Sequence, residues 1–323
     1  MTVGLKNPLK SKTLRFIFKL IISCSLLIHI FRDFSLDLSK LELTIYGLFL
    51  LALAFLLNLA NAYLSALRLK AITPYNFSVF YAFKITLIGI FFNNFFPTNF
   101  GGDIIKAGIF KDKAGDMAHA AGYIFLDRVI GLSTLLLIAV LGLSYFAYLG
   151  EYFPLFAYLI VALFLIALTV LSLLVYFSPS LAKLLSKYPK LISLGRLRKV
   201  MQKSNLPLAL FYGLIFQLNT GFVIYILSLF LGLNISLQYF IVLIPVSNLL
   251  LTIPITFNGL GVRDYIFLNF FEPFAGAGSN LLLLAPLNFA LNLANAVFGA
   301  IFYLLNKKGI ELSQKEVKVS DLP

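Results

Sequence analysis

The feature that most constrains this chain is a series of apolar segments, each about 20 residues long and nearly free of charge. A helix needs about that length to cross the hydrocarbon core of a bilayer. Only 12% of the residues are charged and 60% are hydrophobic, whereas about a quarter of a soluble domain is charged. The sequence therefore predicts an all-α, polytopic integral membrane protein.

The net charge of +13 does not indicate nucleic acid binding, because the basic residues lie in short tracts between the apolar segments. In those positions they set the topology and contact anionic lipids of the inner leaflet. One cysteine and two scattered histidines provide neither a disulfide nor a metal-ligand cluster. The Walker, dinucleotide-binding, H-E-x-x-H and G-x-S-x-G motifs are missing from the sequence, so ATP-driven pumping by this chain alone is not expected. We expect no cofactor and no enzymatic activity.

Loop charges assign a side to each segment, since basic residues concentrate in cytoplasmic loops. The chain begins with a basic stretch, Lys6, Lys10, Lys12, Arg15 and Lys19. We expect this stretch, and the Arg68 and Lys70 pair that should follow the second helix, to lie in the cytoplasm. The membrane is expected to be the cytoplasmic (inner) membrane. Both termini are then cytoplasmic. The predicted spanning segments are residues 14–31, 43–67, 117–149, 155–177, 206–231 and 281–305.

Residues 79–110 are expected to enter the membrane and return to the same side. If they crossed it, the tract at 178–205, which has seven basic residues and no acidic one, would face outward. The same reasoning makes residues 238–271 a second re-entrant hairpin, entering from the other side. Opposed broken helices are typical of inverted-repeat transporters, whose substrate site lies near the midplane. We therefore predict one transmembrane domain, 1–308, with an amphipathic cytoplasmic segment at 178–205 and a short cytoplasmic tail at 309–323.

The first re-entrant segment contains a charged block that follows two glycines, Gly101 and Gly102. Asp103 has the character of an N-cap, and the free N–H groups of a half-helix beginning there would attract an anion. Lys106 would lie one turn further on, on the same face. The alternative is a cytoplasmic loop and an amphipathic helix that Asp103 only caps.

The second re-entrant segment repeats this pattern, with Asn258, Gly259 and Gly261 before Arg263 and Asp264. Arginine is a permanently charged donor with a fork geometry that suits phosphate. A charge inside the membrane is costly and usually functional. The alternatives are a salt bridge between the two neighbours, or an arginine that extends to the outer headgroups.

A third charged pair, Asp127 and Arg128, lies early in the segment at 117–149. If the helix begins near Met117, the pair lies about 15 Å deep by the helical rise. Because residues 129–149 are long enough to span alone, the pair could instead lie at the cytoplasmic rim. The asparagines of the repeated sequence Asn-Leu-Ala-Asn-Ala, at 58–62 and 292–296, are expected to join helices rather than bind a ligand.

These three charged blocks resemble the signature blocks of the lysylphosphatidylglycerol synthase transmembrane-region family, which is flippase-like. Lys106 stands where that family usually has arginine, and Asp264 where it usually has glutamate. The resemblance implies movement of a lipid between leaflets. It also implies that the soluble aminoacyl-transferase domain of the two-part members is missing here, so that a separate enzyme would make the lipid.

The combined hypothesis is a protein that flips a phospholipid, glycolipid or polyprenyl-phosphate lipid. The predicted site residues are Gly101, Gly102, Asp103, Lys106, Asp127, Arg128, Asn258, Gly259, Gly261, Arg263 and Asp264. One alternative is a membrane-embedded transferase that modifies lipids, or an accessory subunit of one. Another is a transporter of small solutes. The sequence does not indicate an oligomeric state.

Overall fold

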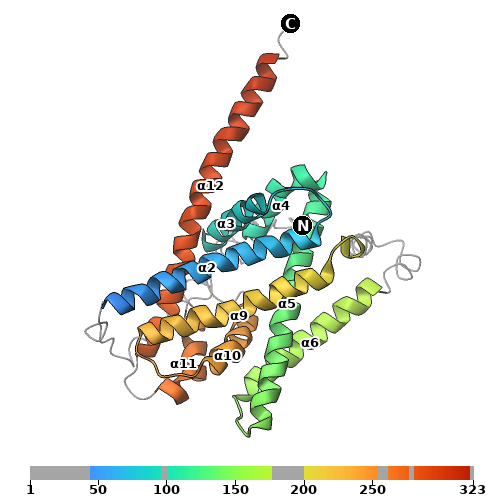
Figure 1. The fold of residues 1–323 in the computed structure, drawn as a ribbon. Coiled ribbons are helices and arrows are strands. Elements are labelled where there is room, and N and C mark those ends of the chain that lie inside the picture. The colour runs from blue at the N-terminus through green and yellow to red at the C-terminus, as the bar shows by residue number, and fades with distance from the viewer. Residues whose placement is uncertain (1–43, 96–100, 177–199, 253–260, 276–279, 321–323) are drawn as a thin grey trace, which may run out of the picture.

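A computed structural model describes residues 44–95, 101–176, 200–252, 261–275 and 280–320, and every regular element in these ranges is a helix (Figure 1). The helices are α2 (Ile45–Ile72), α3 (Val79–Phe95), α4 (Gly101–Ala114), α5 (Met117–Tyr148), α6 (Leu155–Tyr176), α9 (Leu206–Phe230), α10 (Leu237–Thr252), α11 (Val262–Ala275), the 3₁₀ helix η2 (Asn280–Leu283) and α12 (Leu284–Ser320). The predicted first spanning segment, 14–31, lies outside the described residues.

Five of these helical segments are long and apolar enough to cross a membrane: Ile45–Ile72, Met117–Tyr148, Leu155–Leu174, Leu206–Phe230 and Asn280–Leu305. Two further apolar helices, Val79–Asn94 and Leu237–Thr252, are shorter. They begin the two segments that were predicted to be re-entrant. The prediction of a polytopic all-α membrane protein is confirmed.

Helix α2 ends later than predicted, so Arg68 and Lys70 lie inside it rather than after it. The helix stops at Ile72 because Pro74 disfavours a helical conformation for the residue before it. Arg68 remains within the apolar part of the protein because an acidic partner neutralises it there, as described below.

Helices α2 and α9 pack against each other in antiparallel orientation. Near one end the Asn205 N–H donates to the Ala71 carbonyl at 3.0 Å, and further along the Asn61 amide donates to Thr220 Oγ1 at 3.2 Å. The C-terminus of α2 and the C-terminus of α9 therefore lie at opposite ends of the bundle. We call the end at Ala71 the first end and the other the second end.

Helices α3 and α4 form a hairpin that enters from the first end and returns to it. The hydroxyl of Tyr75, just after α2, donates to the Ala114 carbonyl at the end of α4 at 3.0 Å. The Tyr81 hydroxyl near the start of α3 donates to the Ile109 carbonyl at 3.1 Å. Both contacts hold the return helix beside the entry helix.

Helices α10 and α11 form the corresponding hairpin at the second end. Tyr239, near the start of α10, stacks on Phe274 near the end of α11 with ring centroids 4.0 Å apart. Its hydroxyl donates to Glu151, which lies in the short connection after α5. The two hairpins thus begin at opposite ends of the bundle, and their re-entrant course in a membrane stays a prediction.

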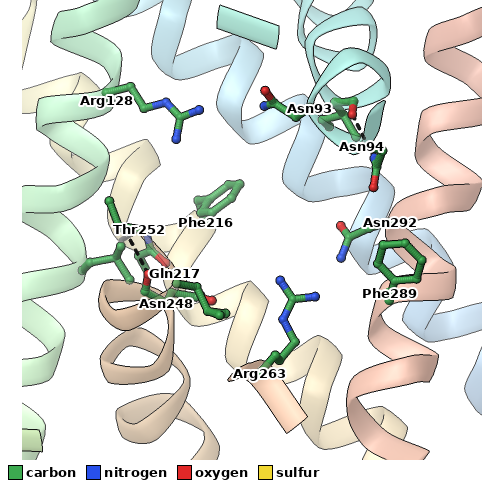
Figure 2. Close-up of a pocket in the computed structure, with 13 residues that line it drawn as sticks. Asn93, Asn94, Arg128, Phe216, Gln217, Asn248, Thr252, Arg263, Phe289 and Asn292 are labelled. Carbon is green, nitrogen blue, oxygen red and sulfur yellow. Dashed lines mark hydrogen bonds between the residues drawn. The ribbon is translucent and has the colours of Figure 1, made fainter. Parts of the chain in front are cut away.

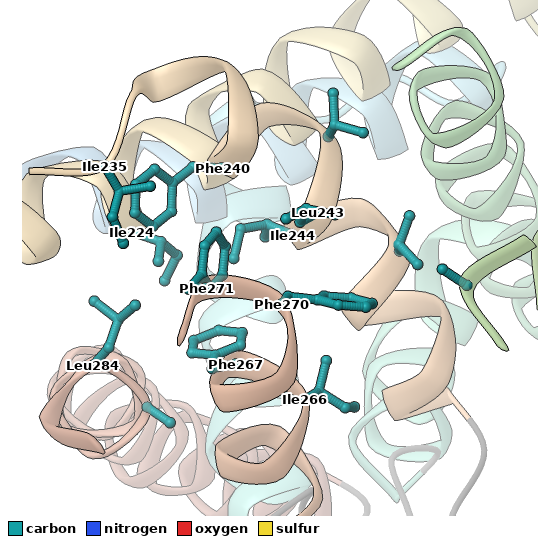
Figure 3. Packing of buried hydrophobic residues seen from close by; sticks show 14 of the residues in the cluster. Ile224, Ile235, Phe240, Leu243, Ile244, Ile266, Phe267, Phe270, Phe271 and Leu284 are labelled. Carbon is teal, nitrogen blue, oxygen red and sulfur yellow. The ribbon is translucent and has the colours of Figure 1, made fainter. Parts of the chain in front are cut away.

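Each hairpin has its own apolar core. Figure 3 shows how Phe267, Phe270 and Phe271 of α11 pack against Phe240 of α10 and the neighbouring helices. The first hairpin packs in a second cluster, around Phe110 and Tyr123 among others. The two hairpins therefore pack in different apolar clusters.

Two asparagines of the repeated sequence, Asn61 and Asn295, join helices as predicted, whereas Asn292 bonds within its own helix. The Asn295 amide of α12 donates to the Asn58 carbonyl of α2 at 3.1 Å. Asn219 of α9 donates to the Leu57 carbonyl and to Asn61 Oδ1, both at 2.8 Å. Helix α12 then continues to Ser320 and extends beyond the rest of the bundle (Figure 1). Of the predicted amphipathic segment at 178–205, residues 178–199 lie outside the described residues.

Candidate functional site

The tips of the two hairpins meet at one cavity of about 330 Å³ in the interior of the bundle (Figure 2). Helices α3, α5, α9, α10, α11 and α12 all contribute to its wall. Its lining consists of Ile90, Asn93, Asn94, Arg128, Leu135, Phe216, Gln217, Asn248, Leu251, Thr252, Arg263, Phe289 and Asn292. Two arginines and a set of amides therefore surround the point where the hairpins meet.

At the tip of the first hairpin, a side chain of α3 caps the start of α4. The Gly102 N–H donates to Asn93 Oδ1 at 2.7 Å. A Cβ at Gly102 would meet the Gly89 carbonyl oxygen of α3, so only glycine lets the two helices approach this closely. Helix α4 begins at Gly101, and Asp103 lies in its first turn. The prediction that Asp103 is the N-cap is wrong, because Asn93 takes that role from another helix.

Asp127 lies at the centre of a buried group of charges that joins α2, α4 and α5. Arg68 donates to it twice, Nε to Oδ1 at 2.7 Å and Nη2 to Oδ2 at 3.2 Å. Lys106 Nζ is 3.9 Å from Oδ2. The side chains of all three residues are less than 10% exposed. Asp127 is thus a buried partner and not a rim anchor.

Arg128, the next residue on α5, points in a different direction, toward the cavity (Figure 2). Its Nε donates to Asp103 Oδ2 at 2.5 Å, which ties α5 to the first turn of α4. Successive residues of a helix point about 100° apart, so one pair can serve both the buried group and the cavity wall. We call Arg68, Asp103, Lys106, Asp127 and Arg128 the ion-pair network.

At the tip of the second hairpin, the acidic residue Asp264 bonds to the start of its own helix. Gly261 has a φ of 79°, a conformation that favours glycine, and precedes α11 as its N-cap. Its N–H donates to Asp264 Oδ2 at 3.1 Å, and its carbonyl accepts from the Tyr265 N–H at 2.9 Å. This is the arrangement of a capping box, in which an acidic side chain of the first turn reaches back to the N-cap.

Arg263 lies beside this cap and points into the cavity (Figure 2). Among the described residues, nothing accepts a hydrogen bond from its guanidinium or lies within salt-bridge distance of it, Asp264 included. Neither alternative from the sequence, a neighbour salt bridge or an extension to the outer headgroups, therefore accounts for its position. Its charge is directed at the space between the hairpins.

The predicted site residues thus divide into separate groups. Arg128 and Arg263 line the cavity, whereas Lys106 and Asp127 lie in the ion-pair network behind it. Gly101, Gly102, Gly261 and Asp264 shape the two helix starts, and the Gly102 and Gly261 N–H groups already donate to protein side chains. Asn258 and Gly259 lie outside the described residues.

The sequence interpretation missed two sets of residues. Arg68 was placed outside its helix, although Asn58, Asn61, Ser65 and Arg68 recur at helical spacing along an apolar segment. The amides of the cavity wall were expected only to join helices or were not considered. Gln217, Asn248 and Asn292 come from three helices, and only the fold brings them together.

The arrangement is suited to an anion. Two guanidinium groups supply charge and fork-shaped donors, and the amides can both donate and accept. Within the described ranges, no group of three or more His, Cys, Asp or Glu side chains gathers where it could hold a metal ion.

Comparison with known proteins agrees with the family resemblance of the three charged blocks. Searches of the curated proteins and of the solved structures found no match to this chain. The family model described as the lysylphosphatidylglycerol synthase TM region matches residues 16–298, which is most of the chain. The match includes every helix that lines the cavity except the C-terminal part of α12. It also suggests a function related to membrane lipids. The chain belongs to the lysylphosphatidylglycerol synthase transmembrane-region family.

Proposed function

We propose that this protein moves a phosphate-bearing lipid from one leaflet to the other, with the headgroup bound in the cavity between the hairpins. The observation that carries the proposal is the convergence of Arg128 and Arg263 on one cavity from opposite halves of the bundle. Family membership supports a role connected with membrane lipids. We infer that the protein acts as a transporter and not as an enzyme.

Phosphate suits this pair of arginines for a physical reason. A guanidinium binds two phosphate oxygens side by side, which gives geometric specificity as well as charge. A cation at membrane depth is costly unless it has a partner. Arg263 has no hydrogen-bonding partner among the described residues, and a bound anion would neutralise its charge.

The size of the cavity fits a headgroup rather than a whole lipid. A volume of about 330 Å³ is at the lower end of the range for small-molecule pockets. The acyl chains would therefore remain outside it, along the apolar helix surfaces. Hairpins that enter from opposite ends give such a site two possible routes of access, as in alternating-access transporters.

The orientation in the membrane is part of the proposal. With basic loops on the cytoplasmic side, both termini lie in the cytoplasm and the basic tract at 178–205 contacts anionic inner-leaflet lipids. The membrane is then the cytoplasmic (inner) membrane, and a separate enzyme supplies the lipid. Cysteine labelling from each side of sealed vesicles tests the orientation directly.

The function is tested by reconstituting the full chain into liposomes that contain acyl-labelled NBD-phosphatidylglycerol. The fraction of label accessible to external dithionite reports movement between leaflets. We expect Arg263→Ala and Arg128→Ala to lower the rate by about tenfold to 100-fold, the loss expected when a charge-assisted hydrogen bond to an anion is removed. Lys111→Ala is the matched control, because Lys111 is exposed on α4 and does not line the cavity.

The proposal fails if empty and protein-containing liposomes expose label at the same rate, or if both arginine variants match the wild type. Mass spectrometry of the recovered lipid separates transport from the transferase alternative, which predicts a covalent product. Uptake of radiolabelled phosphate into the same liposomes tests the small-solute alternative.

A further inference from the structure

We infer that the cavity selects an anionic lipid whose headgroup carries hydroxyl groups and that it rejects a headgroup carrying an ammonium group. The inference rests on the proposed function and adds the substrate class. Its basis is the composition of the cavity wall, where the described residues supply two guanidinium groups and no carboxylate.

The acidic residues near the cavity are already engaged. Asp103 accepts from Arg128, Asp127 from Arg68, and Asp264 from the Gly261 N–H. Residues 96–100, between α3 and α4 in the chain, and residues 253–260, between α10 and α11, include no Asp or Glu. Among the described residues, a headgroup ammonium would therefore lie near two arginines, and each nearby carboxylate already has a partner in the protein.

The polar groups of the wall are suited to hydroxyls. The Asn292 amide N–H donates to the Asn288 carbonyl at 2.9 Å, which leaves its Oδ1 on the cavity side as an acceptor. The Gln217 amide N–H donates likewise to the Gly131 carbonyl. The side chain of Asn248 makes no hydrogen bond with another described residue. A hydroxyl both donates and accepts, so it can pair with groups of either kind.

These observations define the headgroup. The phosphodiester would bind at Arg263, with Arg128 as a second donor, and the hydroxyls of a glycerol or sugar would bind the amides. An aminoacylated headgroup adds an ammonium where the charged side chains among the described lining residues are both arginines. Like charges brought together in a desolvated site repel strongly.

The test compares acyl-labelled NBD lipids that differ only in the headgroup, in liposomes that contain the full chain. The four headgroups are phosphatidylglycerol, phosphatidylmethanol, phosphatidylethanolamine and lysyl-phosphatidylglycerol. We expect phosphatidylglycerol to move fastest. Phosphatidylmethanol, which has the phosphate without the hydroxyls, should move about tenfold more slowly, and the two ammonium-bearing lipids more slowly still.

A single substitution sharpens the test by adding the missing carboxylate. Asn248→Asp has the same shape as the wild type and removes no hydrogen bond between described side chains. We expect it to slow phosphatidylglycerol and to speed up lysyl-phosphatidylglycerol, so that the ratio of the two rates shifts by about tenfold or more. Asn269→Asp on α11, which does not line the cavity, is the matched control and should leave the ratio unchanged.

Binding to the purified protein in detergent, measured as a thermal shift with each unlabelled lipid, separates this inference from the proposed function. If no lipid crosses the bilayer but phosphatidylglycerol binds at least tenfold more tightly than its lysyl derivative, the transport proposal fails and the selectivity stands. Soluble glycerol 1-phosphate, added at the same concentrations, distinguishes a lipid site from a site for the free headgroup. The inference is overturned if lysyl-phosphatidylglycerol binds or moves as well as phosphatidylglycerol, or if glycerol 1-phosphate binds as tightly as the lipid.

Discussion

The two hairpins have the same sequence pattern, glycines followed by an acidic and a basic residue, but use their charges differently. In α4, Asp103 and Lys106 pair with residues of α5, and the Arg68–Asp127 pair joins α2 to the same group. In α11, Asp264 turns back to cap its own helix, and Arg263 faces the cavity. The pattern alone therefore does not decide whether a charge stabilises the fold or binds a ligand.

The neighbouring helices decide it. Helix α4 packs beside α5, which brings Asp127 and Arg128 to it, and Arg68 of α2 reaches the same Asp127. Helix α11 packs among the apolar residues of the larger core, which offer no charged partner (Figure 3). We therefore expect substitutions in the first hairpin to change mainly stability, and substitutions at Arg263 to change mainly transport.

The largest expected effect is that of Asp127→Ala. Removing the carboxylate leaves Arg68 and Lys106 buried without their partner, and breaking a buried ion pair in this way costs about 3–5 kcal/mol in the free energy of unfolding. Chemical denaturation in detergent micelles measures the loss. The exposed Asp112→Ala is the control, and an equal loss in both variants would contradict a structural role for the network.

Gly102→Ala tests the close approach of α3 and α4. The added Cβ would meet the Gly89 carbonyl oxygen and the Asn93 side chain, so the hairpin has to open, at about 1–3 kcal/mol. Gly108→Ala on the same helix is a matched control, because nothing lies within 4 Å of the position that its new methyl group would take. There we expect no loss, and a gain of about 0.5–1 kcal/mol from the better helix former. Equal unfolding midpoints for the two variants would show that the tip is not tightly packed.

Asp264→Ala removes the local cap of the second hairpin. We expect a loss of about 1 kcal/mol, the usual cost of removing a helix cap. Glu272→Ala, exposed on the same helix, should change the unfolding free energy by much less. A loss as large as that of Asp127→Ala would mean that Asp264 takes part in a wider network, and the contrast between the hairpins would then disappear.

The smallest expected effect on stability is that of Arg263→Gln. No hydrogen bond to a described residue is lost, so the unfolding free energy should change by less than about 0.5 kcal/mol. In the same preparation, lipid movement should fall by about tenfold or more. A marked loss of stability would place Arg263 with the structural charges.

Much of this fold follows from the sequence, because long apolar segments and loop charges are local signals. Two hairpins from opposite ends of the bundle were expected from placing the basic tract at 178–205 on the cytoplasmic side, and that placement itself stays a prediction. The contacts of Asp127 were not predictable, since its partners Arg68 and Lys106 lie far away in the chain. From the sequence, Asp103 was expected to cap α4 because it follows two glycines. In the structure the side chain of Asn93, which belongs to α3, caps the start of α4 instead.

The cavity was predictable only in part. Arg128 and Arg263 stood out as charges in apolar surroundings. The amides did not, because an asparagine that joins two helices and one that faces a cavity look alike in a sequence. On α12, Asn295 joins two helices, whereas Asn292, three residues away, faces the cavity.

The central claim is that the headgroup of a lipid occupies the cavity between the hairpin tips. Photo-crosslinking with a phosphatidylglycerol analogue that carries a diazirine on its headgroup, followed by mass spectrometry of the peptides, tests it most directly. We predict adducts on the α9, α10 and α12 residues that line the cavity, such as Gln217, Asn248 and Asn292, and their loss in Arg263→Gln. Adducts confined to exposed outer residues such as Leu159 and Leu163 of α6, and unchanged in Arg263→Gln, would contradict the claim.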